Sequence, residues 1–221
     1  MAEPEIAYQS MNFLFLHLAK TGGLSLRRTL VHKNILYNYD CIHNGMLIEF
    51  RDGLISSRKK LHNQPFLQHY DEVFSLVRDP LRRLASCWNY FSHGGLNQYS
   101  EKKYFHGDME FQELLSKEAP TLEQCCFRLD LVAKSIPHFR PMTSWIDQLP
   151  EDIRKKMVIG KQERYALDVN ACLGRIAPDV DSHKIAHVNQ SSVRLSALGL
   201  TAAAIASARK YYASDYQRFG Y

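Results

Sequence analysis

Short apolar runs alternate with longer segments of helical periodicity along this chain. The runs at 13–18, 72–78 and 157–160 contain aromatic or β-branched residues and are typical of buried strands. The segments that follow carry apolar residues three or four positions apart, which predicts helices over 81–91, 109–117, 122–134, 165–173 and 201–219. This alternation predicts an α/β fold with a mostly parallel central sheet flanked by helices.

The remaining segments have weaker patterns. Alternating apolar residues predict a short strand over 34–39, and 46–60 is expected to form a short helix that ends in a basic run. Glycines and polar residues over 92–107 indicate a loop or lid. We expect a flexible lead-in over 1–10 and a single domain over 11–221, because no repeat or linker divides the chain.

Composition narrows the class of protein. With 221 residues, 45% of them hydrophobic, the chain is long enough for a sizeable core. The net charge of +5 suits an anionic ligand but is too dispersed to predict nucleic-acid binding. Five cysteines without metal-site spacing indicate reduced thiols and no metal. The absence of a signal sequence or an apolar span makes a cytoplasmic location the default expectation, with no transmembrane segment.

The first strand leads into a segment with the features of a phosphate-binding loop. Its residues are Lys20, Thr21, Gly22, Gly23, Leu24 and Ser25. Glycines allow backbone amides to approach an anion, and a helix N-terminus favours negative charge. Lys20 precedes both glycines, so the loop differs from the Gly-x-x-x-x-Gly-Lys-Ser/Thr pattern of nucleotide triphosphatases. An ordinary strand–turn–helix corner with a surface lysine is the alternative.

A second corner of this kind follows the strand at 72–78. Asp79 is a natural N-cap and Pro80 a natural first helical residue. Arg78, at the end of the strand, can bind an anion through its guanidinium, and Ser86 lies about two turns into the helix. The pair therefore predicts a second phosphate site, although Arg78 and Asp79 can also form a purely structural pair.

These two corners together resemble the sulfotransferases that use 3′-phosphoadenosine 5′-phosphosulfate, in particular the branch that sulfates carbohydrates, of the heparan sulfate 2-O- and chondroitin type. Residues 17–26 are similar to its first motif, His-x-Pro-Lys-Thr-Gly-Gly-Thr-Ser-Leu, with Ala19 and Leu24 in place of proline and threonine. Residues 78–86 match its second motif, Arg-Asp-Pro-x-x-Arg-x-x-Ser. Weaker similarities at 138–142 and 187–192 occur in the family's order.

The resemblance implies a P-loop-like three-layer sandwich that transfers a sulfuryl group from this donor to a hydroxyl. It implies that Lys20 lies beside the bridging oxygen of the donor, whose phosphosulfate contacts the loop. Arg78 and Ser86 would bind the donor's 3′-phosphate, with help from Asn189 or Arg194. The product would be adenosine 3′,5′-bisphosphate, and the transfer would need no metal.

The acceptor side rests on histidines. His62 is the first choice for the catalytic base, because it lies where relatives carry a His-Gly-His-like segment, and His138 and His43 are reserves. His138 and Arg140 can instead bind the acceptor. The expected acceptor is a carbohydrate or a small molecule with a hydroxyl group.

Two other functions fit the same motifs. A nucleotide-binding, kinase-like enzyme also needs a phosphate loop, although the lysine order and the lack of a clear magnesium aspartate argue against it. A catalytically inactive module that binds the donor or its product would keep both phosphate sites and lack a base. Nucleic acid is the least expected partner, and the sequence leaves the oligomeric state open.

Overall fold

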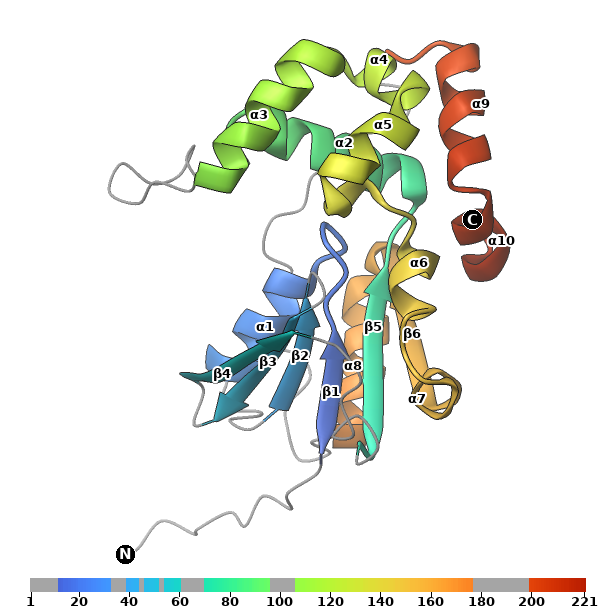
Figure 1. The fold of residues 1–221 in the computed structure, drawn as a ribbon. Helices are drawn as coiled ribbons and strands as arrows, with labels where there is room; N and C mark the ends of the chain where they lie inside the picture. The colour runs from blue at the N-terminus through green and yellow to red at the C-terminus, as the bar shows by residue number, and fades with distance from the viewer. Residues whose placement is uncertain are drawn as a thin grey trace, which may run out of the picture.

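The computed structural model describes residues 12–32, 39–43, 46–51, 54–60, 70–95, 106–176 and 199–221. Its centre is a six-stranded sheet with the order β4-β3-β2-β1-β5-β6 (Figure 1). The strands are β1 (Phe13–Leu16), β2 (Tyr39–His43), β3 (Met46–Arg51), β4 (Leu54–Lys60), β5 (Glu72–Val77) and β6 (Met157–Lys161). β2 and β5 both run parallel to β1, and β6 runs parallel to β5. The predicted α/β class with a mostly parallel sheet is confirmed.

The hairpin at one edge of the sheet corrects a prediction. Residues 46–60, expected to be helical, form the antiparallel strands β3 and β4. The helical interpretation was wrong because Leu47 and Ile48 are both buried, on opposite faces of the sheet. A strand that is covered on both faces lacks the alternation that identifies strands. Of the strand predicted over 34–39, only Tyr39 is described, where β2 begins.

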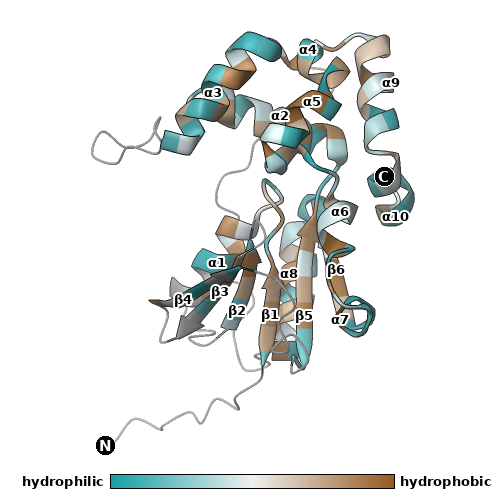
Figure 2. Ribbon diagram, viewed as in Figure 1, coloured by the Kyte–Doolittle hydropathy of each residue, from teal (hydrophilic) through white to brown (hydrophobic). Residues whose placement is uncertain are grey.

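Side chains of alternating direction on β1 build two cores. Phe13 and Phe15 pack on the face that α1 (Gly23–His32) and α8 (Tyr165–Ile176) cover. Leu14 and Leu16 pack on the other face, with residues of α6 (Met142–Ile146) and α7 (Glu151–Lys156). Figure 2 shows these strands as predominantly hydrophobic between the helices. The sheet is therefore covered by helices on both faces.

A separate group of helices lies beyond the carboxyl ends of the parallel strands (Figure 1). It contains α2 (Pro80–Ser92), α3 (His106–Glu118), α4 (Leu122–Phe127), α5 (Leu129–Ser135) and α9 (Ala202–Tyr211), and it has its own apolar core. Two long helices predicted from the sequence are each divided in two. The break at Arg128 separates α4 from α5, and the break at Tyr212 separates α9 from α10 (Ala213–Phe219).

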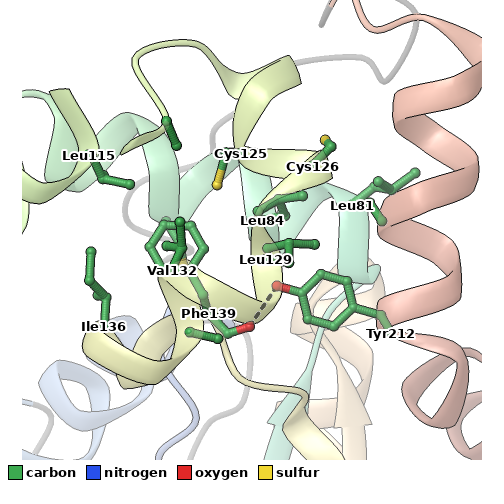
Figure 3. Packing of buried hydrophobic residues seen from close by; sticks show 14 of the residues in the cluster. Leu81, Leu84, Leu115, Cys125, Cys126, Leu129, Val132, Ile136, Phe139 and Tyr212 are labelled. Carbon is green, nitrogen blue, oxygen red and sulfur yellow. Dashed lines mark hydrogen bonds between the residues drawn. The ribbon is translucent and has the colours of Figure 1, made fainter. Parts of the chain in front are cut away.

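The C-terminal helices are fixed to the start of α6 and to the segment before it. The buried Tyr212 hydroxyl donates to the Phe139 carbonyl at 2.7 Å (Figure 3). The buried Asp215 carboxylate accepts from the backbone amides of Met142 and Thr143, both at 2.8 Å. These bonds hold Phe139 and the first two residues of α6 against the C-terminal helices. Among the helices of the described segments, none has the length and apolar character needed to cross a membrane.

Candidate functional site

Basic side chains gather where the parallel strands end. His17 directly follows β1, His43 is the last residue of β2, and Arg78 directly follows β5. The carboxyl ends of parallel strands meet at one edge of a sheet, and ligands of open α/β sheets bind there. The two corners that the sequence predicts, β1–α1 and β5–α2, are therefore neighbours in the structure.

The loop between β1 and α1 has an unusual backbone. Lys20 has a φ of 66° and Gly22 a φ of 93°, so both lie in the left-handed region. For lysine this conformation is uncommon and marks a locally constrained turn. The amides of Ser25 and Leu26 both donate to the Gly22 carbonyl, at 3.0 and 3.2 Å, which starts α1 at Gly23. The loop thus turns sharply and aims the N-terminus of α1 at the sheet edge.

Close packing explains the two glycines. A Cβ atom at Gly23 would lie 2.0 Å from the His17 ring, and one at Gly22 would lie 3.3 Å from the Tyr165 ring. The Thr21 hydroxyl is buried and donates to the Leu18 carbonyl at 2.8 Å, so it stabilises the loop itself. Ser25 is also buried, whereas the Leu24 side chain is 45% exposed.

Two guanidinium groups join the loop to α2. Arg78 Nη1 donates to the Lys20 carbonyl at 3.2 Å, and Arg83 Nε donates to the Ala19 carbonyl at 3.2 Å. Arg83 Nη2 also donates to the carbonyls of His138 and Arg140, at 2.6 and 2.8 Å. Arg83 is only 1% exposed, and its Nη1 has no hydrogen-bond partner within the described part of the chain. Arg83 thus connects the predicted donor loop with the predicted acceptor segment.

The second corner carries its own carboxylates. Asp79 caps α2 by accepting from the Arg82 amide at 2.8 Å, and Pro80 is the first helical residue, as predicted. Glu163 accepts from the Asp79 amide at 2.8 Å and from the Tyr221 hydroxyl at 2.9 Å. Burial lowers the pKa of Arg78, while the nearby Glu163 carboxylate raises it. Negative charge at this corner therefore comes from the protein.

The Lys20 ammonium lies between the two corners. Its Nζ is 4.0 Å from the centre of the Tyr90 ring on α2. Burial lowers the pKa of Lys20, the Cys87 thiol raises it, and the Arg78 guanidinium lowers it. No salt bridge joins Lys20 to a carboxylate of the described residues. Lys20 is a partly desolvated cation close to other cations, an arrangement that attracts an anion.

Three imidazoles lie beside this lysine. The rings of His17 and His43 stack with centroids 4.4 Å apart, and the His138 ring lies edge-on to His43 at 6.2 Å. Burial lowers the pKa of all three, to about 3 for His138, and neighbouring positive groups add to the effect. All three are therefore neutral near pH 7. His43 Nδ1 must donate to the His17 carbonyl, 3.0 Å away, because a carbonyl only accepts.

The structure brings some of the predicted site residues together. Lys20, Arg78 and His138 belong to one cluster, in which Arg78 lowers the pKa of Lys20 and Lys20 lowers the pKa of His138. Ser86 is half-buried and follows Arg83 by three residues on α2, so the two are neighbours on the helix surface. The Arg140 guanidinium points elsewhere: its Nε donates to the Ala133 carbonyl, and its Cζ lies 5.9 Å from the Trp145 ring.

Other predicted residues fall outside the described part of the chain. These are His62, Asn189 and Arg194. Conversely, His17 and Glu163 are recognisable in the sequence only as positions of family-like motifs, without a role, and the Lys20–Tyr90 contact was not predicted. His17 had a usable signal, because a histidine that directly follows a buried strand lies at the edge where ligands bind. Glu163 and Tyr90 approach the site only through the packing of distant segments.

Comparisons with protein-family models, curated proteins and solved structures give no match.

Proposed function

We propose that this chain is a sulfotransferase that moves a sulfuryl group from 3′-phosphoadenosine 5′-phosphosulfate to a hydroxyl group of a carbohydrate or small-molecule acceptor. The proposal includes a P-loop-like three-layer sandwich as the fold. One observation carries it: Arg78 and Arg83 donate to the carbonyls of Lys20 and Ala19, so both predicted phosphate motifs meet on one loop. A ligand with phosphates on the 3′ and 5′ positions of its ribose suits two neighbouring cationic corners.

The residues fit such an anionic donor. The side chains of Lys20 and Arg78 supply positive charge, and the amides at the start of α1 favour a phosphate. Arg83 Nη1 is a buried donor without a hydrogen-bond partner in the described ranges, which adds to the positive potential. Ser86 lies on the same helix as Arg83 and offers a hydroxyl to the 3′-phosphate.

The proposed transfer is an in-line displacement. The bond between sulfur and the bridging oxygen breaks, the acceptor oxygen forms the new bond to sulfur, and the acceptor proton passes to a base. Lys20 stabilises the negative charge that develops on the bridging oxygen. The five free cysteines are all buried, which supports thiols kept reduced and a cytoplasmic setting as part of this proposal.

We propose His43 as the base among the described histidines. Its Nδ1 donates to the His17 carbonyl, so the neutral ring carries its lone pair on Nε2, ready to accept a proton. His138 is less suited because burial lowers its pKa to about 3, which makes it a weak base. His62, the first choice from the sequence, remains a competing prediction.

A mutation pair separates these two histidines. We expect His43→Ala to lower turnover about a hundredfold while affinity for adenosine 3′,5′-bisphosphate stays within about threefold. His62→Ala serves as the matched variant in the same assay of sulfuryl transfer. If His62→Ala loses most of its turnover and His43→Ala keeps normal turnover, His62 is the base and the proposal for His43 is wrong. If both variants retain turnover, neither histidine is the base.

Calorimetric titration tests the proposal as a whole. Adenosine 3′,5′-bisphosphate is compared with adenosine 5′-phosphate and with ATP plus Mg²⁺. We expect the bisphosphate to bind most tightly, and Arg78→Ala to weaken it at least about tenfold, as for the loss of a charged hydrogen bond. A preference for ATP with magnesium would replace the proposal with a kinase-like function. Tight bisphosphate binding without transfer to any acceptor would indicate an inactive binding module.

A further inference from the structure

The contact between Lys20 and Tyr90 joins the phosphate loop to α2 by a side chain. Arg83, Cys87 and Tyr90 follow one another on α2 at intervals of four and three residues, so they share one face of the helix. Arg83 binds the backbone of the loop at Ala19, and Tyr90 binds the side chain of the next residue. One helix face therefore contacts two consecutive loop residues, one through its carbonyl and the other through its ammonium.

We propose that Tyr90 is a positioning residue that holds the Lys20 ammonium beside the imidazole cluster through the face of its ring. Its role in catalysis rests on the proposed function, whereas the contact itself does not. The aromatic face attracts a cation through its quadrupole, most strongly where water is excluded. Lys20 is partly buried and forms no ion pair with a carboxylate of the described residues, so the ring offsets part of the cost of desolvation.

The choice of an aromatic partner has a chemical consequence. A carboxylate in this place would hold Lys20 in an ion pair, and it would also repel an anionic ligand. The tyrosine ring holds the cation without adding negative charge, so the ammonium stays available to an anion. The ring itself is half-buried and packs against the apolar core of the helical group, next to Phe91. This packing fixes the surface on which the ammonium rests.

Turnover measurements test the positioning role. We expect Tyr90→Leu to lower kcat by about tenfold, within the two- to thirtyfold range of cation–π contacts, while KM for the donor stays within about threefold. Tyr90→Phe keeps the aromatic face and should retain turnover within about threefold. Phe111→Leu is the matched control, because Phe111 packs on Phe91 in the same helical group and does not contact Lys20. Equal losses in Tyr90→Leu and Tyr90→Phe would overturn the proposal.

A second measurement is independent of activity. Lysines are converted to ¹³C-dimethyl-lysines, the Lys20 signal is assigned with Lys20→Arg, and its titration is followed by NMR. Because the ring stabilises the charged form, we expect Tyr90→Leu to lower the titration midpoint by about 0.3 to 1 pH unit relative to wild type and Tyr90→Phe. An unchanged midpoint in Tyr90→Leu would overturn the contact. Tyr90→Met, which keeps more bulk, replaces the leucine variant if that variant does not fold.

The two proposals fail in different ways. If adenosine 3′,5′-bisphosphate does not bind the wild-type chain, the sulfotransferase proposal fails, and the NMR titration still decides whether Tyr90 holds Lys20. If the bisphosphate binds and the Lys20 midpoint is the same in all Tyr90 variants, only the inference about Tyr90 fails.

Discussion

The two strand–helix corners at the carboxyl edge of the sheet differ in where their negative charge comes from. At the β5–α2 corner, Asp79 accepts from the Arg82 amide and Glu163 from the Asp79 amide. At the β1–α1 corner, the first turn of the helix contains no acidic residue, and the amides of Ser25 and Leu26 donate to the Gly22 carbonyl. The start of α2 is thus capped by the Asp79 carboxylate, whereas α1 has no acidic residue in its first turn.

This difference assigns separate roles to the two corners. A helix N-terminus favours an anion, and at β5–α2 the protein itself provides that anion. Arg78 is then the group through which this corner can bind an external phosphate. At β1–α1, no acidic residue lies in the first turn of the helix, and no carboxylate of the described residues forms a salt bridge with Lys20. At the first corner, the proposed donor would therefore interact with backbone amides and with Lys20. At the second corner, it would interact with side chains of α2 and with Arg78, which precedes that helix.

The strongest way to break the link between the corners is to remove Arg83. We expect Arg83→Met to lower the free energy of unfolding by about 3 kcal/mol, because three carbonyls lose a charged hydrogen bond. Relief of the buried charge offsets part of that loss. Bisphosphate affinity should also fall about tenfold, since Ala19 is released beside Lys20. Urea unfolding and calorimetry provide the two measurements.

Arg82→Met is the matched control for this experiment. Arg82 is the neighbouring residue on α2 and is half-exposed, and its backbone amide, not its side chain, contacts Asp79. We expect the free energy of unfolding of this variant to lie within about 0.5 kcal/mol of the wild-type value. If Arg83→Met were equally stable and bound the bisphosphate normally, the two corners would be energetically independent.

Acidification should affect the cluster of neutral imidazoles formed by His17, His43 and His138. Burial lowers the pKa of His17, His43 and His138 in the folded chain, to about 3 for His138. In the unfolded chain these groups titrate near 6.5. Below that pH the unfolded state binds more protons, so stability falls as the pH drops from about 6.5 toward the folded pKa. Each imidazole contributes up to about 1.4 kcal/mol per pH unit to this loss.

His138→Gln isolates one of these contributions. Urea unfolding at pH 7.5 and pH 5.5 gives a loss of stability for each chain, and we expect that loss to be smaller in His138→Gln by about 1 kcal/mol. His106→Gln is the control, because the side chain of His106 is 77% exposed. A pH effect of equal size in wild type and His138→Gln would show that His138 is protonated in the folded chain as well.

Elements with long periodic patterns, and the local structure of the second corner, could be predicted from the sequence. The strand at β5, the cap at Asp79 and the proline at the start of α2 depend on neighbouring residues, and all are confirmed. The β3–β4 hairpin could not be predicted, because Leu47 and Ile48 are buried on opposite faces of the sheet. The strand therefore lacks the alternation of apolar and polar residues that identifies a strand. The breaks at Arg128 and Tyr212 follow from tertiary packing, which local propensity does not report.

The site divides in the same way. Lys20, the glycines and Arg78 were proposed from local motifs, since each lies in or next to the connection between a strand and the helix that follows it. The connections between them are not local: Arg83 reaches carbonyls 55 to 64 residues away, and Glu163 caps an amide 84 residues before it. Such contacts depend on the order of the strands in the sheet, which no short segment specifies.

The smallest expected effect comes from removing the cap of the second corner. We expect Asp79→Ala to lower the free energy of unfolding by about 1 kcal/mol, because the Arg82 amide loses its acceptor. Bisphosphate affinity should stay within about threefold, since Asp79 caps the protein's own helix and is not among the residues proposed to bind the ligand.

Gly22→Ala is the corresponding variant at the first corner. It forces alanine to a φ of 93° and places a Cβ 3.3 Å from Tyr165, so we expect at least about a tenfold loss of bisphosphate affinity together with about 1–2 kcal/mol of stability. Urea unfolding and calorimetry of both variants make the test. If Asp79→Ala loses as much affinity as Gly22→Ala, the helix start of the second corner also takes part in binding, and the two corners do not have the separate roles assigned above.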